Sequence, residues 1–277
     1  MTLGELLAEG EQLLAQEGID TPRLDAELLV ARVLGLTRGE LYHHRDMQLA
    51  ERKVAAARGL FERRVRREPL AYVLGEWGFR RLTLKVDPRV LVPRPETEVV
   101  VDRCLEHVHG IAEPAVLDVG TGSGAIALAI ADEHLGARVT AMDISEDALE
   151  VARENAAANG LEVTFERRDL LTGFTGSYDL VVSNPPYVSA DEVEDLEPEV
   201  RDWEPRLATV GNEHTEAIAR SARDVLRPDG WLVLEVAAGR GETTAELLRG
   251  LGYAQVGVSQ DLTGRDRVVE GKWGTSS

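Results

Sequence analysis

From residue 115 onward the sequence alternates between short apolar segments and longer helical stretches, and this alternation restricts the fold more than any other feature. The short segments predict β-strands. Strands connected through helices form a mostly parallel sheet with helices on both faces, whereas the short final connection predicts an antiparallel pair. We therefore expect an α/β fold with a seven-stranded, doubly wound sheet. The predicted strands are 115–119, 138–143, 162–166, 179–183, 231–236, 254–258 and 267–270.

The first part of the chain has a different pattern. Apolar residues recur at helical spacing through residues 1–72, which predicts a small helical domain. Residues 73–95 contain short alternating segments around Asp87-Pro88, and they predict a β-hairpin linker with its turn at these two residues. The α/β domain then extends over residues 96–277 and begins with a helix.

The charge of the chain argues against one broad class of function. The sequence has 49 Asp and Glu residues against 31 Lys and Arg, so its formal net charge is −18. Proteins that bind DNA or RNA through phosphates usually present a basic face, and direct DNA binding is therefore disfavoured. The single cysteine, Cys104, cannot form an intramolecular disulfide, and no apolar run is long enough to span a membrane. We expect a cytoplasmic protein with no membrane partner.

A glycine-rich turn follows the first strand of the α/β domain. Residues 116–124 read VLDVGTGSG, and a helix is predicted to begin directly after them. Glycines let the backbone turn sharply and approach a ligand beside a helix N-terminus. The turn does not identify the ligand, because Gly120, Gly122 and Ala125 also fit the looser dinucleotide-binding pattern. The candidate binding residues are Gly120, Thr121, Gly122, Ser123 and Gly124.

Two acidic residues follow the next two strands. Asp143 closes the second strand, about 20 residues beyond the glycines, where an acidic side chain can accept hydrogen bonds from both hydroxyls of a ribose. A plain helix N-cap is the alternative role. Asp169 follows the third strand in a similar way, and it could lie beside the edge of an adenine with Leu170 against the face of the ring.

The fourth predicted strand runs directly into Asn184-Pro185-Pro186-Tyr187. Both Asn184 and Pro185 precede a proline, which favours extended conformations and a rigid strand exit. This exit offers the Asn184 side-chain oxygen and the Pro185 carbonyl as acceptors, with the ring of Tyr187 beside them. Two acceptors suit a substrate with an –NH2 group on a planar conjugated system. A proline-rich loop that simply ends the strand is the alternative.

Taken together, the glycine turn, the ribose acid and the Asn-Pro-Pro-Tyr strand exit resemble the S-adenosylmethionine-dependent amino-methyltransferases. Residues 69–75 (PLAYVLG), 78–79 (GF) and above all 92–98 (VPRPETE) narrow the resemblance to the peptide chain release factor glutamine methyltransferases, over nearly the whole chain. The resemblance implies a Rossmann-like methyltransferase sheet, a helical domain that recognises the substrate, and S-adenosyl-L-methionine as the cofactor.

The resemblance also implies roles for particular residues. The glycine turn would line the methionine part of the cofactor, Asp143 its ribose, and Asp169 and Leu170 its adenine. Asn184, which also borders the cofactor, would act with Pro185 and Tyr187 in catalysis. The implied activity is methylation of the side-chain amide nitrogen (N5) of the glutamine in the Gly-Gly-Gln tripeptide of release factors. The residues that would receive this glutamine are Asn184, Pro185, Pro186 and Tyr187.

Three other functions compete with this one. An adenine-N6 DNA methyltransferase could use the same Asn-Pro-Pro-Tyr acceptors after base flipping, but the negative charge and the lack of a large target-recognition insertion disfavour it. An NAD-dependent oxidoreductase is favoured only by the looser glycine pattern. A non-catalytic scaffold would bind neither S-adenosylmethionine nor NAD.

Two charged segments and two histidine pairs remain without a role. Residues 191–204 hold eight acidic residues against Arg201 alone, which predicts a solvated flap or a surface for a basic partner. Four arginines between Arg63 and Arg67 predict a solvated helix face or a contact with the protein substrate. Residues 43–44 and 107–109 contain histidines without partners at metal-ligand spacing, so we expect no metal site.

Overall fold

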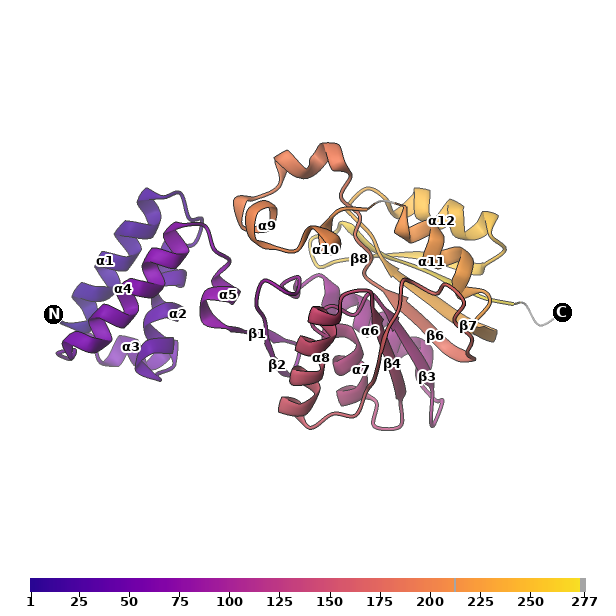
Figure 1. Cartoon of the computed structure of the whole chain (residues 1–277), viewed down its shortest axis with the longest axis horizontal. Coiled ribbons are helices and arrows are strands. Elements are labelled where there is room, and N and C mark those ends of the chain that lie inside the picture. Colours follow the sequence, from indigo (N-terminus) through magenta and orange to yellow (C-terminus); the bar gives the residue numbers. More distant parts are fainter. Residues whose placement is uncertain (212, 275–277) are drawn as a thin grey trace. The chain divides into compact units, whose positions relative to one another are not determined.

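The computed structural model describes residues 1–211 and 213–274, and the chain forms two compact units (Figure 1). The helical unit comprises Met1–Glu76 and Glu197–Trp203. The α/β unit comprises Trp77–Leu196 and Glu204–Ser277. This division differs from the predicted one in two respects. The predicted linker, residues 73–95, is divided between the two units at Glu76 and Trp77. A seven-residue segment that we expected in the α/β domain belongs to the helical unit, so the chain leaves the α/β unit and returns to it.

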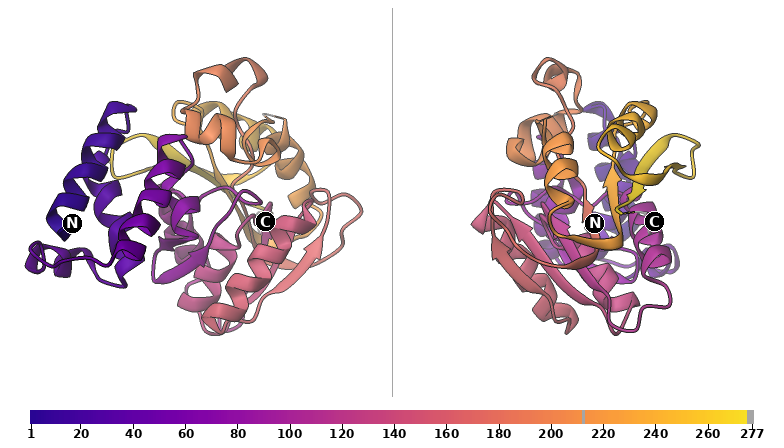
Figure 2. Two further views of the ribbon diagram at one scale, coloured as in Figure 1. Left: turned by 60° about the vertical axis from the view of Figure 1, so that its left-hand side comes forward. Right: turned by 90° about the vertical axis from the view of Figure 1, so that its right-hand side faces the viewer.

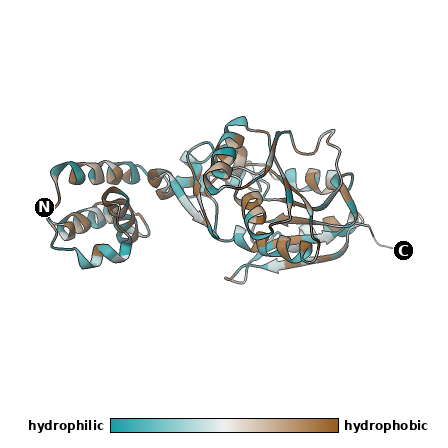
Figure 3. Ribbon diagram, turned by 90° about the horizontal axis from the view of Figure 1, so that it is seen from below, coloured by the Kyte–Doolittle hydropathy of each residue, from teal (hydrophilic) through white to brown (hydrophobic). Residues whose placement is uncertain are grey.

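The helical unit is built from amphipathic helices around an apolar core, and its helices carry both hydrophobic and hydrophilic residues (Figure 3). Thr2 and Thr37 begin two of the helices with reciprocal capping boxes to Glu5 and Glu40. Fully buried Leu3, Leu29 and Phe61 lie in the core. The helices are α1 (Leu3–Gln16), α2 (Pro22–Leu34), α3 (Arg38–His43), α4 (Glu51–Val65), α5 (Leu70–Leu74) and α9 (Pro198–Trp203).

The linker forms a β-hairpin, but the predicted position of its turn is wrong. The strands are β1 (Glu76–Phe79) and β2 (Leu82–Lys85), so the turn lies at Arg80-Arg81 rather than at Asp87-Pro88. Arg80 has a left-handed φ of 51°, which is uncommon for a residue other than glycine. Its guanidinium is held by ion pairs with Asp102 and Glu133, and these long-range contacts stabilise the turn.

The α/β unit contains the predicted seven-stranded sheet. The strand order is β5-β4-β3-β6-β7-β9-β8, with the first five strands parallel and β9 antiparallel to both of its neighbours. The predicted antiparallel pairing of the last two strands is therefore confirmed. The strands are β3 (Ala115–Val119), β4 (Arg138–Asp143), β5 (Thr164–Arg167), β6 (Tyr178–Ser183), β7 (Leu226–Glu235), β8 (Ala254–Gln260) and β9 (Asp266–Lys272).

Helices cover both faces of this sheet (Figure 2). One apolar cluster joins the sheet to α6 (Thr97–Val108) and α7 (Ala125–Glu133), and the other joins it to α11 (His214–Ala222) and α12 (Gly241–Gly250). This doubly wound arrangement explains why the central strand β3 is buried along its whole length. The remaining elements are α8 (Glu146–Asn159), a 3-10 helix (Ala190–Asp195) and α10 (Arg206–Thr209).

No helix in the described part of the chain has both the length and the apolar character needed to cross a membrane.

Candidate active site

Three strand ends meet at one edge of the sheet. In the parallel register, Val119 of β3 pairs with Met142 of β4 on one side and with Ser183 of β6 on the other. The residues that follow these three positions therefore leave the sheet together. They are Gly120, Asp143 and Asn184, the starting points of the predicted donor and acceptor sites. This carboxyl edge is where doubly wound sheets bind ligands.

The glycine turn leaves open space at its centre. Gly120 and Gly122 have left-handed φ values of 76° and 55°, and a Cβ atom on either would meet no atom within 4 Å. Glycine is thus required by the backbone conformation, and its small size lets a ligand approach. Gly124 has a different role, because a Cβ atom there would lie 3.1 Å from Leu128 and 3.3 Å from Ala152. The absence of a side chain at Gly124 therefore allows close packing at the start of α7.

Asp143 is fixed beside this turn. Its Oδ2 atom accepts a hydrogen bond of 2.9 Å from the Gly122 N–H, and its Oδ1 atom accepts one of 2.9 Å from the Ser145 N–H. Burial raises the pKa of Asp143, although these backbone hydrogen bonds act in the opposite direction. Each oxygen has lone pairs left for a further donor, so the carboxyl group fits the hydroxyls of a ribose.

A cavity opens at this edge, with an empty volume of about 1160 Å³ that includes the solvent at its mouth. Nine of the predicted site residues line it, and the donor and acceptor motifs therefore share one cavity. These residues are Gly120, Thr121, Gly122, Ser123, Asp143, Asp169, Leu170, Asn184 and Pro186.

Three predicted site residues do not line the cavity: Gly124, Pro185 and Tyr187. Pro185 is buried, and burial raises the pKa of Tyr187. The strand exit is held by the Ser183 hydroxyl, which donates a hydrogen bond of 2.6 Å to the Val119 carbonyl across the sheet.

Sequence reasoning missed one wall of the cavity. The segment after the hairpin contributes Arg89, Pro93, Arg94 and Thr97. Residues 92–98 had supported the family resemblance without receiving a role, so the motif carried a signal that we did not interpret. On the acceptor side, the missed lining residues are Pro205, Leu207, Ala208 and His214.

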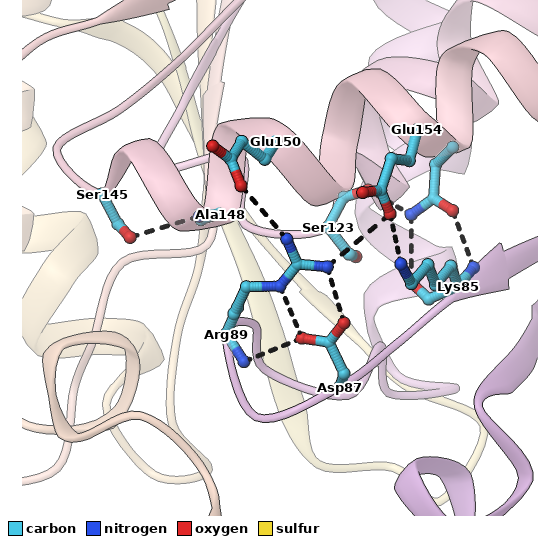
Figure 4. A network of polar contacts seen from close by, with 9 residues as sticks. Lys85, Asp87, Arg89, Ser123, Ser145, Ala148, Glu150 and Glu154 are labelled. Carbon is cyan, nitrogen blue, oxygen red and sulfur yellow. Dashed lines mark hydrogen bonds and ion pairs between the residues drawn. The ribbon is translucent and has the colours of Figure 1, made fainter.

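Arg89 is anchored in a network that joins the post-hairpin segment to α8 (Figure 4). Its Nε and Nη2 atoms bind the Asp87 carboxylate at 2.9 and 2.7 Å, and Nη1 reaches Glu150 at 3.3 Å. Buried Asn155 extends the network by donating a hydrogen bond of 2.9 Å to the Ser123 carbonyl. The glycine turn is thereby tied to α8.

Arg94 links the post-hairpin segment to the acceptor side. Its Nη2 atom lies 2.8 Å from both carboxylate oxygens of Glu204, whose side chain is only 1% exposed. Burial raises the pKa of Glu204, and the charge of Arg94 opposes that effect. A charge-assisted contact of this length positions Pro205 and the residues after it against the cavity.

Two further carboxyl groups are buried near the site. Asp118 accepts a hydrogen bond of 2.7 Å from the Thr121 hydroxyl, and burial raises its pKa to about 7. Glu235 closes β7, and burial raises its pKa to about 7 as well. One oxygen of each group has no hydrogen-bond partner among the described residues. Within residues 1–211 and 213–274, no group of three or more His, Cys, Asp or Glu side chains could hold a metal ion.

Comparison with known proteins identifies the family. A family model described as the PrmC N-terminal domain matches residues 5–75, and one described as a methyltransferase small domain matches residues 98–198. A release factor glutamine methyltransferase of Geobacter sulfurreducens is 39% identical over 278 residues, covering 99% of this chain and 97% of the relative. One of Deinococcus radiodurans is 41% identical, covering 98% of this chain and 99% of the relative.

The chain belongs to the family of release factor glutamine methyltransferases. This membership confirms the predicted family. It also confirms the prediction that the protein is an S-adenosylmethionine-dependent methyltransferase.

Solved structures confirm the fold. A methyltransferase from Pyrococcus furiosus aligns with a TM-score of 0.52 at 19% identity, covering 80% of this chain and 98% of the other. The RsmC 16S rRNA methyltransferase of T. thermophilus, solved with AdoMet and guanosine, aligns with a TM-score of 0.53 at 17% identity, covering 72% of this chain and 49% of the other. At these identities the likeness shows the Rossmann-like fold alone.

The two charged segments contact each other through Glu199, whereas most other acidic residues of 191–204 are exposed, as expected for a solvated flap. Arg64 is 7% exposed, and Glu199 pairs with both Arg64 and Arg67. One of the histidines packs inside the fold. His107 stacks on Trp231 with ring centroids 3.7 Å apart, which agrees with a packing role.

Proposed function

We propose that this enzyme methylates the side-chain amide nitrogen of the glutamine in the Gly-Gly-Gln tripeptide of release factors. The observation that carries the proposal is the meeting of Asn184 and Pro186 with Asp143 and the glycine turn in one cavity. The names of the full-length relatives support the substrate. A substrate from the translation machinery implies that the reaction takes place in the cytoplasm.

The residues of the cavity fit the cofactor. S-adenosylmethionine, when bound, supplies an electrophilic methyl group on a sulfonium centre. The open space at Gly120 and Gly122 would accept its methionine part, and the free lone pairs of Asp143 would accept its ribose hydroxyls. Asp169 and Leu170 line the same cavity and would lie along the adenine.

On the acceptor side, the Asn184 side-chain oxygen, which lines the cavity, would accept a hydrogen bond from one N–H group of the glutamine amide. The family resemblance assigns the other N–H group to the carbonyl of Pro185, a buried residue that does not line the cavity. An amide nitrogen is a poor nucleophile because its lone pair is delocalised into the carbonyl. Hydrogen bonds to both N–H groups orient the nitrogen, and orientation alone can lower a reaction barrier by several kcal/mol. The proton released after methylation is acidic enough for water to take it, so the site requires no strong base. Tyr187 would support this arrangement at the strand exit.

We further propose that the helical unit, predicted as residues 1–72, recognises the release factor. The α/β unit would then carry out the chemistry, and the post-hairpin segment up to residue 95 would complete the cavity wall. Its residues Arg89, Pro93 and Arg94 support this role, because they line the cavity.

A transfer assay with labelled S-adenosylmethionine tests the proposal. The purified enzyme is incubated with a release factor and, as a matched control, with the same release factor whose tripeptide glutamine is replaced by glutamate. We expect label in the first protein and none in the second, because glutamate has no amide nitrogen. Equal labelling of both proteins, or label only in an added adenine-containing DNA duplex, would contradict the proposal.

A further inference from the structure

The segment that follows α10 is fastened to the Asn-Pro-Pro-Tyr motif by backbone contacts. Val188, the residue after Tyr187, forms an isolated parallel bridge with Val210. The Val188 N–H donates a hydrogen bond of 3.1 Å to the Thr209 carbonyl, and the Val188 carbonyl accepts one of 3.0 Å from the Gly211 N–H. All of these residues belong to the α/β unit. Gly211 is therefore held beside the strand exit that presents the methyl-acceptor groups.

Gly211 lies between the ring of His214 and the acceptor motif. A Cβ atom on Gly211 would lie 2.5 Å from His214 Cε1 and 3.5 Å from Pro186 Cγ. Glycine is also suited to this position because its φ is 148°, a value that other residues rarely adopt. His214 begins α11 and lines the same cavity as Asn184 and Pro186. The imidazole ring of His214 thus lies at the acceptor end of the cavity.

The hydrogen bonding of His214 leaves one ring nitrogen able to accept a proton. Nδ1 lies 3.1 Å from the carbonyl oxygen of Gly211. A carbonyl oxygen can only accept a hydrogen bond, so Nδ1 carries the proton of the neutral ring and Nε2 keeps a lone pair. Nε2 has no hydrogen-bond partner in the described part of the chain. The ring therefore has a basic nitrogen available for a substrate.

The other ionisable residues that line the cavity are less suited to take a proton from the substrate. An arginine has no lone pair that could accept one. Asp143 already accepts backbone hydrogen bonds with both of its oxygens, and Asp169 is proposed to lie along the adenine. His214 is thus the basic group that we assign to the acceptor end. The other ionisable lining residues are Arg89, Arg94, Asp143, Arg168 and Asp169.

We propose that His214 is a catalytic residue that accepts the proton released by the methylated glutamine amide. The inference rests on the proposed function. Methyl transfer leaves a positive charge on the amide nitrogen, and the amide oxygens of Asn184 and Pro185 are too weakly basic to keep its proton. One N–H bond then breaks with its electron pair remaining on nitrogen, and the proton bonds to Nε2. The Nδ1–H group keeps its hydrogen bond to Gly211 until solvent at the cavity mouth takes the proton.

The test compares His214→Asn with the wild type and with the control His109→Asn in the full-length enzyme. His109 is an exposed histidine of the α/β unit that does not line the cavity, so its variant makes the same substitution away from the site. The steady-state constants kcat and KM are measured with an intact release factor. Titration with S-adenosylmethionine shows that each variant retains a folded cavity.

Water can still take the proton in the variant, so we expect activity to be reduced and not abolished. Because a positioned general base contributes about 100-fold or more, kcat of His214→Asn should fall about 10- to 100-fold while KM changes by less than about threefold. The control should match the wild type. An unchanged kcat would overturn the inference. A rise in KM alone would overturn it as well, because His214 would then only contact the substrate.

Chemical rescue separates a proton acceptor from a residue that only packs. His214→Gly leaves space for a free imidazole molecule where the ring of His214 lies. We expect added imidazole to raise kcat of His214→Gly as its concentration increases, and to leave kcat of the wild type unchanged. A glycine variant whose rate does not respond to imidazole would overturn the inference.

The tautomer of His214 can be measured in the free enzyme. Nitrogen NMR of enzyme labelled in its histidines, assigned by comparison with His214→Asn, should show a neutral ring with a proton on Nδ1 and none on Nε2. A proton on Nε2 of the neutral ring would overturn the inference. If the wild type left the release factor unmethylated, the proposed function would fail. An active wild type and an equally active His214→Asn would overturn the inference alone.

Discussion

The position of Asn184 at the sheet edge could be predicted from the sequence. It follows the last residue of β6, and the parallel register brings it to the same sheet edge as Gly120 and Asp143. The sequence allowed this prediction because each motif directly follows an apolar strand. It did not allow the prediction of Arg94 in the cavity wall, because its place depends on an ion pair with Glu204 far along the chain.

Replacement of Asn184 tests the acceptor role. We expect Asn184→Ala to abolish methyl transfer and to leave the affinity for S-adenosylmethionine within about threefold, because the amide oxygen orients the substrate and not the cofactor. Asn184→Asp retains an acceptor oxygen and should keep more activity than the alanine variant. Single-turnover rates and calorimetric titration measure the two effects. Near-normal glutamine methylation by Asn184→Ala would refute the role.

Because the pKa of Asp118 is raised, we expect the free energy of unfolding to depend on pH. Its pKa is about 7 in the folded protein against an ordinary value of 3.8, so between these pH values the folded state keeps a proton that the unfolded chain loses. Stability contributed by Asp118 therefore falls as the pH rises through this window, by about 4 kcal/mol at most. Asp118→Asn removes the titration.

Urea denaturation of the wild type and Asp118→Asn at several pH values checks this expectation. From pH 4 to pH 7, the free energy of unfolding of the wild type should fall relative to that of Asp118→Asn. Above pH 7 the difference between the two proteins should stay constant. Parallel stability profiles of the two proteins would show that Asp118 titrates normally.

At the scale of elements, local patterns predicted strands better than turns. The bounds of β3 and β4 agree with the prediction, because each is a short segment with several apolar residues that ends beside a glycine or at an acidic residue. The hairpin turn was misplaced, since Asp87-Pro88 has strong turn propensity and Arg80 has none. Long-range contacts of Arg80 with Glu98, Asp102 and Glu133 hold the observed turn.

Replacing either of two glycines in the helical unit with alanine should change the stability of the protein in opposite directions. A Cβ atom on Gly10 in α1 would lie 2.4 Å from Phe61 Cζ, whereas one on Gly59 in α4 would meet no atom within 4 Å. We expect Gly10→Ala to destabilise the protein by about 1–3 kcal/mol through overpacking. Gly59→Ala should stabilise it by about 0.5–1 kcal/mol, because alanine favours a helix interior.

Thermal unfolding of the two glycine variants measures these changes. Each variant serves as the control for the other, since both replace a helical glycine with alanine. A similar change in Tm for both would contradict the described packing of α1 against α4.

At the scale of the whole molecule, the distribution of charge matters more than its sum. The net charge of −18 led us to expect a protein substrate rather than nucleic acid. It did not reveal that Glu199 and Glu204 are paired with arginines distant in sequence. The family resemblance covered most of the chain, but the return of residues 197–203 to the helical unit depends on those long-range pairs and on no local pattern.

The central claim is that this enzyme methylates one amide nitrogen of a protein. Tandem mass spectrometry of a release factor, incubated with the enzyme and S-adenosylmethionine, tests it most directly. We predict the mass of one added methyl group on the glutamine of the Gly-Gly-Gln tripeptide, and no such addition with Asn184→Ala. A methyl group on another residue, or an unmodified tripeptide after incubation with the wild-type enzyme, would contradict the claim.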